Sequence, residues 1–119
     1  MRNFRLLDVW KKGHELTLDI YRLTAAFPNA ERFGLTSQLQ RAAASIGANL
    51  AEGCGRDTGA EFHRFVQIAS GSACEVENHL LLAADLGLLE TTTCERLNDN
   101  VNEVKRMLVG LARSLANNR

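Results

Sequence analysis

The last quarter of the chain carries the sequence feature that most restricts its fold. Apolar side chains recur there in alternating steps of four and three, at Leu97, Val101, Val104, Leu108, Leu111 and Leu115. This spacing places one continuous apolar seam along a helix, and such a seam is stable only when other helices cover it. The pattern therefore predicts a long amphipathic helix within a helical bundle. No segment shows the period-two alternation that is typical of half-buried strands.

The rest of the chain shows the helical period in three further segments. We expect helices over about residues 7–26, 36–53, 59–86 and 92–115, joined by short connections. Helices of this length with short connections favour an up-down-up-down four-helix bundle. A length of 119 residues is typical of one domain, so we predict an all-α chain with a single domain over residues 1–119.

Residues near the predicted helix ends carry capping signals. Pro28, the only proline, is expected to end the first helix at or before the preceding residue. Thr36 is expected to cap the start of the second helix, and Gly53 has the position of a C-terminal glycine. Thr58 and Thr92 each precede a glutamate by three residues, so each is expected to begin a capping box.

The overall charge and the cysteines narrow the class of protein. The chain has 14 basic and 14 acidic residues, whereas proteins dedicated to nucleic acids usually carry a basic surplus. The cysteine count is three, without a C-x-x-C pair, which fits free thiols in a reducing cytoplasm. The N-terminus lacks a signal-peptide pattern, and no apolar stretch is long enough to span a membrane. We therefore expect a cytoplasmic protein without a membrane role.

Catalytic and metal-binding constellations are not apparent in the sequence. Glu75 and His79, four residues apart, could reach one metal, but no second pair of this kind exists, and such a pair is more often a helix-surface interaction. Glu52 and Glu77 could join Glu75 inside a bundle, although carboxylates on helices are more often paired or solvated. We expect no cofactor, no metal and no enzymatic activity.

A polar stripe follows one side of the 36–53 helix and continues past its end. Its members are spaced by four, four, three and four residues: Arg41, Ser45, Asn49, Glu52 and Arg56. One interpretation is a solvated surface. The other is a hydrogen-bonded seam between helices or between subunits, because serine and asparagine gain little on an exposed helix face and the alanines between them leave room for close packing. The sequence leaves both open.

The 7–26 helix is apolar over more than one face. Leu7, Trp10, Leu18 and Tyr21 lie off the face that carries Leu16 and Ile20. Surplus apolar and aromatic side chains of this kind are typical of protein interfaces, so the pattern favours self-association. A wide core face that holds all of these residues is the alternative.

A small basic group lies near the N-terminus, with Phe4 and Trp10 among its members. It consists of Arg2, Arg5, Lys11 and Lys12. Basic and aromatic side chains together suit a nucleic acid. A solvated helix end is the favoured interpretation, because nearby acidic residues dilute the charge.

The residues also resemble a known family. The segment FGLTSQLQRAAASIGANLAEGCGR, residues 33–56, resembles the signature of the bacterial four-helix bundle proteins, also called S23 or intervening-sequence proteins. Upstream, VWKKGHELTLDIYRLTAAFP is similar to the first helix of that family. Downstream, EFHRFVQIASGSACEVENHLLLAADLGLL is similar to its third helix. The resemblance covers nearly the whole chain.

This resemblance implies a ring-shaped homopentamer without enzymatic activity. It also implies that two groups of residues occupy family motif positions: Arg41, Ser45, Asn49, Glu52, Gly53 and Arg56 in the second helix, and Gly71, Ser72, Glu75 and Glu77 in the third. We accordingly expect a self-assembling structural or interaction module whose partners are copies of itself and an unidentified protein.

An RNA- or DNA-binding accessory role is the alternative. A related branch, the accessory variability proteins of diversity-generating retroelements, binds nucleic acid and a reverse transcriptase through a strongly basic surface. This chain departs from that branch in its net charge of zero and in having Gln40-Arg41 in place of paired arginines.

Overall fold

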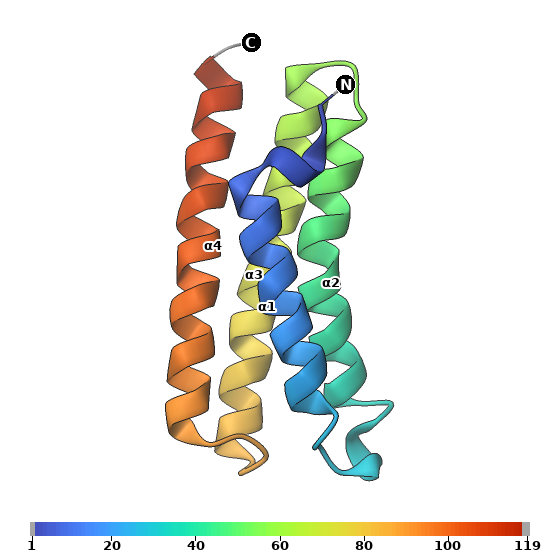
Figure 1. The fold of residues 1–119 in the computed structure, drawn as a ribbon, viewed down its shortest axis with the longest axis vertical. Coiled ribbons are helices and arrows are strands. Elements are labelled where there is room, and N and C mark those ends of the chain that lie inside the picture. The colour runs from blue at the N-terminus through green and yellow to red at the C-terminus, as the bar shows by residue number, and fades with distance from the viewer. Residues whose placement is uncertain (1, 118–119) are drawn as a thin grey trace.

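Four α-helices, each antiparallel to the next, form the computed structural model, which describes residues 2–117 (Figure 1). They are α1 (Asp8–Thr24), α2 (Leu35–Cys54), α3 (Gly59–Asp85) and α4 (Thr91–Asn117). Two short 3-10 helices, η1 (Phe4–Leu6) and η2 (Asn29–Glu31), precede α1 and α2. The described residues contain no strand, so the all-α prediction is confirmed. Each helix end lies within two residues of its predicted position.

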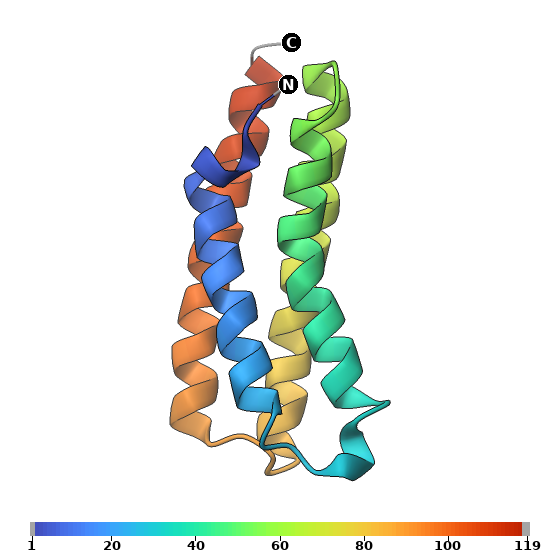
Figure 2. The same ribbon diagram turned by 45° about the vertical axis from the view of Figure 1, so that its right-hand side comes forward.

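The helices are arranged as a bundle 46 Å long (Figures 1 and 2). Helices that follow one another in the chain pack side by side, and α4 returns beside α1. The contact between α2 and α3 is the most extensive, and the contact between α1 and α4 is the least. Both ends of the described chain therefore lie at the same end of the bundle, next to the α2–α3 connection.

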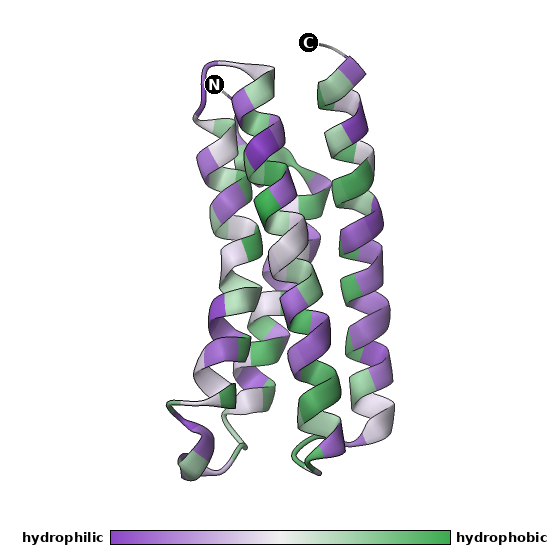
Figure 3. Ribbon diagram, turned by 180° about the vertical axis from the view of Figure 1, so that it is seen from behind, coloured by the Kyte–Doolittle hydropathy of each residue, from purple (hydrophilic) through white to green (hydrophobic). Residues whose placement is uncertain are grey.

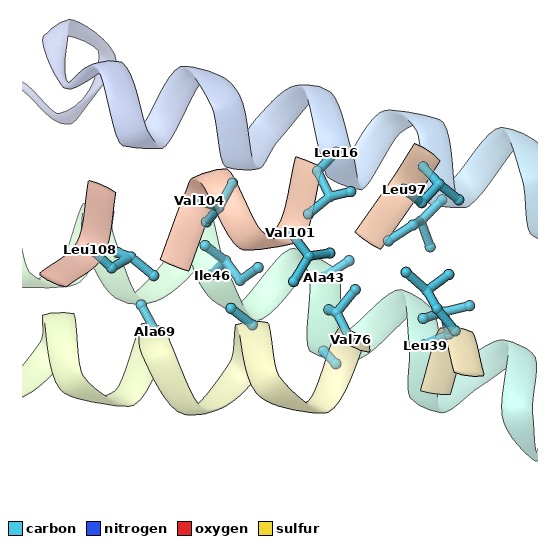
Figure 4. Packing of buried hydrophobic residues seen from close by; sticks show 14 of the residues in the cluster. Leu16, Leu39, Ala43, Ile46, Ala69, Val76, Leu97, Val101, Val104 and Leu108 are labelled. Carbon is cyan, nitrogen blue, oxygen red and sulfur yellow. The ribbon is translucent and has the colours of Figure 1, made fainter. Parts of the chain in front are cut away.

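Side chains from all four helices meet in one apolar core (Figure 4). The predicted seam of α4 contributes Leu97, Val101, Val104 and Leu108, which are all buried. Each fully buried leucine or valine stabilises the fold by roughly 1.5–3 kcal/mol relative to an exposed one. Outside this seam, most residues of α4 are hydrophilic (Figure 3).

Several of the predicted cap positions need correction. Thr36 is the second residue of α2 and not its cap, because the helix begins at Leu35, whose buried side chain anchors the chain one residue earlier. Thr92 likewise lies inside α4, which begins at Thr91. The prediction for Thr58 is correct, since its Oγ1 accepts a hydrogen bond from the Glu61 amide at 3.1 Å.

The glycine expected at the end of α2 also lies elsewhere. Gly53 is a buried residue within α2, which continues to Cys54. Leu6, which directly precedes the predicted 7–26 helix, belongs to η1, and its side chain is exposed. The change from η1 to α1 at Leu7 breaks the helical period, so Leu6 points away from the face that Val9 begins. Among residues 2–117, no helix is both long and apolar enough to cross a membrane.

Candidate functional site

The middle of the polar stripe lies against α3. The Ser45 and Ser72 hydroxyl groups are 2.8 Å apart and share a hydrogen bond between the two helices. The Asn49 side-chain amide donates to the Ser45 Oγ at 2.9 Å and to the Ser45 carbonyl at 2.8 Å. The Ser72 Oγ also donates to the Ile68 carbonyl at 3.3 Å. At its centre the stripe thus has the geometry of a hydrogen-bonded seam within one chain.

The two ends of the stripe are solvent-exposed. Glu52 and Arg56 form an ion pair of 3.1 Å with each other, and the Arg56 guanidinium lies 4.8 Å from the centre of the Phe65 ring. Arg41, at the opposite end, has no ion-pair partner within 4.0 Å among residues 2–117. The outer part of the stripe therefore remains available to a partner.

Gly53 of α2 lies directly against two phenylalanines of α3. A Cβ atom at this position would be 2.7 Å from Cδ1 of Phe62 and 3.0 Å from Cβ of Phe65. Both distances are shorter than ordinary van der Waals contact. The glycine is thus needed because the two phenylalanines occupy the space that any side chain would take.

A hollow of about 330 Å³ opens between α2 and α3 beside Ser45 and Ser72. Arg41 and Glu75 line it from opposite helices, and neither forms an ion pair within the described part of the chain. His79 also lines it, and its Nδ1 atom is buried without a hydrogen-bond partner. No group of three metal-ligating side chains occurs among residues 2–117. The hollow brings together opposite charges without a nucleophile–base pair.

The surplus apolar residues of α1 divide into two groups. Trp10 packs onto α2, with its Nε1 3.1 Å from where a Cβ of Gly47 would lie, and its ring stacks on His14 at 4.7 Å. Leu18 and Tyr21 are 40% and 46% exposed. Trp10 therefore agrees in part with a wide core face, whereas Leu18 and Tyr21 lie on the surface.

The basic residues near the N-terminus do not gather into one patch. The Arg2 guanidinium lies 5.1 Å from the centre of the Phe62 ring, and the Arg2 amide donates to the Cys54 carbonyl at 3.0 Å. Lys12 forms an ion pair with Glu103 of α4 at 3.4 Å. Arg5 lies over the Phe4 ring, while Lys11 is exposed on α1. Two of the four side chains thus already have partners in other helices.

A second apolar surface on α3 was missed by sequence reasoning. Its exposed members are Ile68, Leu82 and Leu86, and the exposed Gly71 and Glu75 lie between them on the same side of the helix. Ile68 and Leu82 are about four helical turns apart, and Leu82 and Leu86 are about one turn apart. The three side chains therefore lie on the same side of α3. This spacing could have indicated the exposed apolar residues in the sequence. The more regular apolar spacing on the buried side of α3 overlaps with it and obscures it.

The three thiols differ in their surroundings. Burial raises the pKa of Cys54, and the nearby Arg2 partly opposes this rise. Burial also raises the pKa of Cys94, with Asp85 and Glu95 adding to the effect. Cys74 is exposed on α3. Neither of the buried thiols has the lowered pKa that a catalytic thiolate needs.

Comparisons with known proteins agree with this fold. Residues 5–110 match the model of the family described as 23S rRNA-intervening sequence protein. The chain is also similar to the crystal structure of a protein with unknown function from the S23 ribosomal protein family of Bacteroides thetaiotaomicron VPI-5482. The two share 26% sequence identity with a TM-score of 0.82, over 88% of this chain and 95% of the other. No curated protein matches the chain.

Proposed function

The chain belongs to the family of 23S rRNA-intervening sequence proteins, and from this we propose that it is a non-enzymatic, self-assembling interaction module that forms a ring-shaped homopentamer. The observation that carries the proposal is an unpartnered apolar surface across α1 and α2. We call it the α1–α2 surface, and it consists of Leu18 and Tyr21 of α1 with Ala44 and Ala48 of α2.

The composition of the α1–α2 surface suits a packed helix. Leu18 and Tyr21 offer apolar area, and tyrosine is among the residues that contribute most to protein interfaces. Ala44 and Ala48 are exposed and small, so a second helix could approach the α2 backbone closely. An exposed apolar surface with these features is more favourable when it is covered by another protein surface.

A ring requires two unlike surfaces on each copy, and α3 supplies the second. Ile68, Leu82 and Leu86 are exposed there, and Gly71 leaves space for a neighbour. Contact between two different surfaces of identical chains is heterologous, and heterologous contacts close into rings when the rotation between copies permits. The pairing of the α1–α2 surface with the α3 surface therefore supports a cyclic assembly.

The polar groups of the chain support a role without chemistry of its own. Arg41, Glu75 and His79 line one hollow but form no assembled acid–base pair. The unpaired Arg41 and Glu75 are instead suited to contact a neighbouring copy or another protein. The free cysteines fit a cytoplasmic location for this assembly.

Sedimentation velocity at micromolar concentration tests the proposal. We expect a mass of about 65 kDa, five times the 13.1 kDa of one chain. Ala48→Arg places a long cation on the α1–α2 surface, while its helix propensity remains favourable. We expect this variant to keep the helical circular dichroism spectrum of the parent and to sediment as a monomer.

Ser114→Arg is the matched control, because Ser114 is exposed on α4 and lies outside both apolar surfaces. It should sediment as the parent does. A monomeric parent chain would refute self-assembly. An intact oligomer of Ala48→Arg would show that the ring uses another surface.

A further inference from the structure

The charges of this neutral chain are separated along the bundle. Two ion pairs lie near its middle, Lys12–Glu103 and Lys105–Glu77. Apart from these pairs, the half that holds both chain ends (residues 2–14, 47–72 and 104–117) has seven basic and four acidic residues. The other half (residues 15–46 and 73–103) has four basic and eight acidic residues. One half of the molecule is thus basic and the other acidic.

Within the basic half, two shallow hollows lie on either side of Val109, one along α4 alone and the other between α3 and α4. Their volumes are about 480 and 460 Å³. Val109 and Arg113 line both hollows, and no acidic residue lines either. We call this region the α3–α4 basic surface, and it consists of His63, Gln67, Ser70, Arg106, Val109 and Arg113.

Two arginines of this surface are free to bind an anion. Arg106 and Arg113 are exposed and have no ion-pair partner within 4.0 Å among the described residues, whereas Lys105 beside them is held by Glu77 at 2.9 Å. Seven residues of helix, close to two full turns, place the Cα atoms of the two arginines on one side of α4, about 10.5 Å apart along its axis. Two unpaired cations on one side of a helix can contact phosphates of the same strand, and such contacts supply most of the sequence-independent affinity for nucleic acids.

The remaining side chains of the surface suit bases that are not paired. Single-stranded nucleic acids stack their bases on aromatic side chains, including histidine, and His63 lines the same hollow as Arg113. Gln67 and Ser70 add hydrogen-bonding groups to that hollow. Val109 is 48% exposed between the arginines and offers apolar contact to a sugar or base.

We propose that the α3–α4 basic surface binds single-stranded nucleic acid, with Arg106 and Arg113 on the phosphates and His63 against a base. The surface is complete within one chain, so this proposal goes beyond self-assembly and does not depend on it.

Fluorescence anisotropy of the full chain with a labelled, unstructured 20-nucleotide RNA in 50 mM salt tests the proposal. The parent should bind, and its affinity should fall as salt rises. The double variant Arg106→Gln/Arg113→Gln should bind at least tenfold more weakly. Its slope of log affinity against log salt should be smaller by about 1.4, because each lost phosphate contact contributes about 0.7 for a single strand.

Arg22→Gln/Arg96→Gln is the matched control. It removes the same two charges from exposed positions in the acidic half, and its affinity should stay within about twofold of the parent. An equal loss in both double variants would show an effect of net charge and would overturn the assignment to this surface. Absence of parent binding in 50 mM salt would refute the proposal.

Two further measurements separate the remaining outcomes. If poly-glutamate displaces the RNA at equal charge concentration, the surface is a site for acidic polypeptides and the nucleic-acid assignment is wrong. Sedimentation of both double variants reports assembly independently of RNA. A variant that keeps the parent mass while losing RNA affinity supports the RNA site, and a monomeric parent that still binds RNA refutes only the ring.

Discussion

At the scale of single residues, Gly53 decides how closely α2 and α3 can pack. Its position near the predicted end of a helix favoured a helix-terminating glycine, an explanation that uses only the neighbouring residues in the sequence. The structure gives a tertiary one, since Phe62 and Phe65 occupy the space beside its Cα. Sequence spacing within α2 could not reveal this contact, because it depends on how the following helix returns.

Replacing this glycine should therefore be destabilising. Gly53→Ala adds a Cβ atom 2.7 Å from Phe62, whose ring is buried and cannot move freely. Overpacking of this kind costs about 1–3 kcal/mol, which outweighs the gain of about 1 kcal/mol in helix propensity. The free energy of unfolding in urea should fall accordingly.

Gly110→Ala is the matched control, because nothing lies within 4 Å of its added Cβ atom. It should raise the free energy of unfolding by up to about 1 kcal/mol. If both variants are stabilised, the close contact at Gly53 is not present in solution.

At the scale of helices, the two threonine–glutamate pairs show how a local signal can be correct in one place and wrong in another. Thr58 caps α3 through the Glu61 amide, as its spacing predicted. Thr92 has the same spacing but lies inside α4. The seam of α4 fixes which face is buried, but it does not fix the residue at which the helix begins.

The two threonines therefore make a direct comparison. Thr58→Ala removes a cap hydrogen bond of 3.1 Å and should lower the free energy of unfolding by about 1 kcal/mol. Thr92→Ala should change it by less than about 0.5 kcal/mol, as exposed substitutions without a specific contact usually do. Equal effects in a denaturant titration would contradict the assignment of the caps.

The helices themselves could be predicted from the sequence because their periods are long and regular. The seam from Leu97 to Leu115 is an example, and only Leu111 within it is incompletely buried. The polar stripe was also predicted as a group. Its division into a seam at Ser45 and exposed ends at Arg41 and Arg56 was not predictable, because that depends on where α3 crosses α2.

At the scale of the whole molecule, the net charge was a poor guide to the surface. A total of zero had counted against anion binding, yet the antiparallel arrangement collects basic residues from three separate segments in one half of the bundle. The surplus comes from residues 2–14 and 104–117, which are far apart in the sequence. Only the order and direction of the helices show it, so this property belongs to the fold.

The buried thiols predict how stability depends on pH. Burial raises the pKa of Cys54 and Cys94 in the folded state. The folded chain thus retains thiol protons that the unfolded chain releases above its ordinary thiol pKa of about 8.5. The unfolded state binds fewer protons there, so the free energy of unfolding should decrease as pH rises beyond about 8.5.

Urea unfolding at pH values from 7 to 10 measures this decrease. Cys54→Ala/Cys94→Ala should lower the stability at pH 7 but flatten its dependence on pH. Cys74→Ala should leave that dependence unchanged, because Cys74 is exposed. A slope that survives the double substitution would assign the effect to other groups.

The even number of antiparallel helices brings both chain ends to one end of the bundle, where the Arg2 amide is held by the Cys54 carbonyl. The helices could therefore keep their packing if the backbone were joined at these two ends and cut at another position. A circular permutant could join the two ends through a short linker and open the chain within residues 28–30, which are all exposed. Its helices would follow one another as α2, α3, α4 and α1, with every neighbour in the core retained.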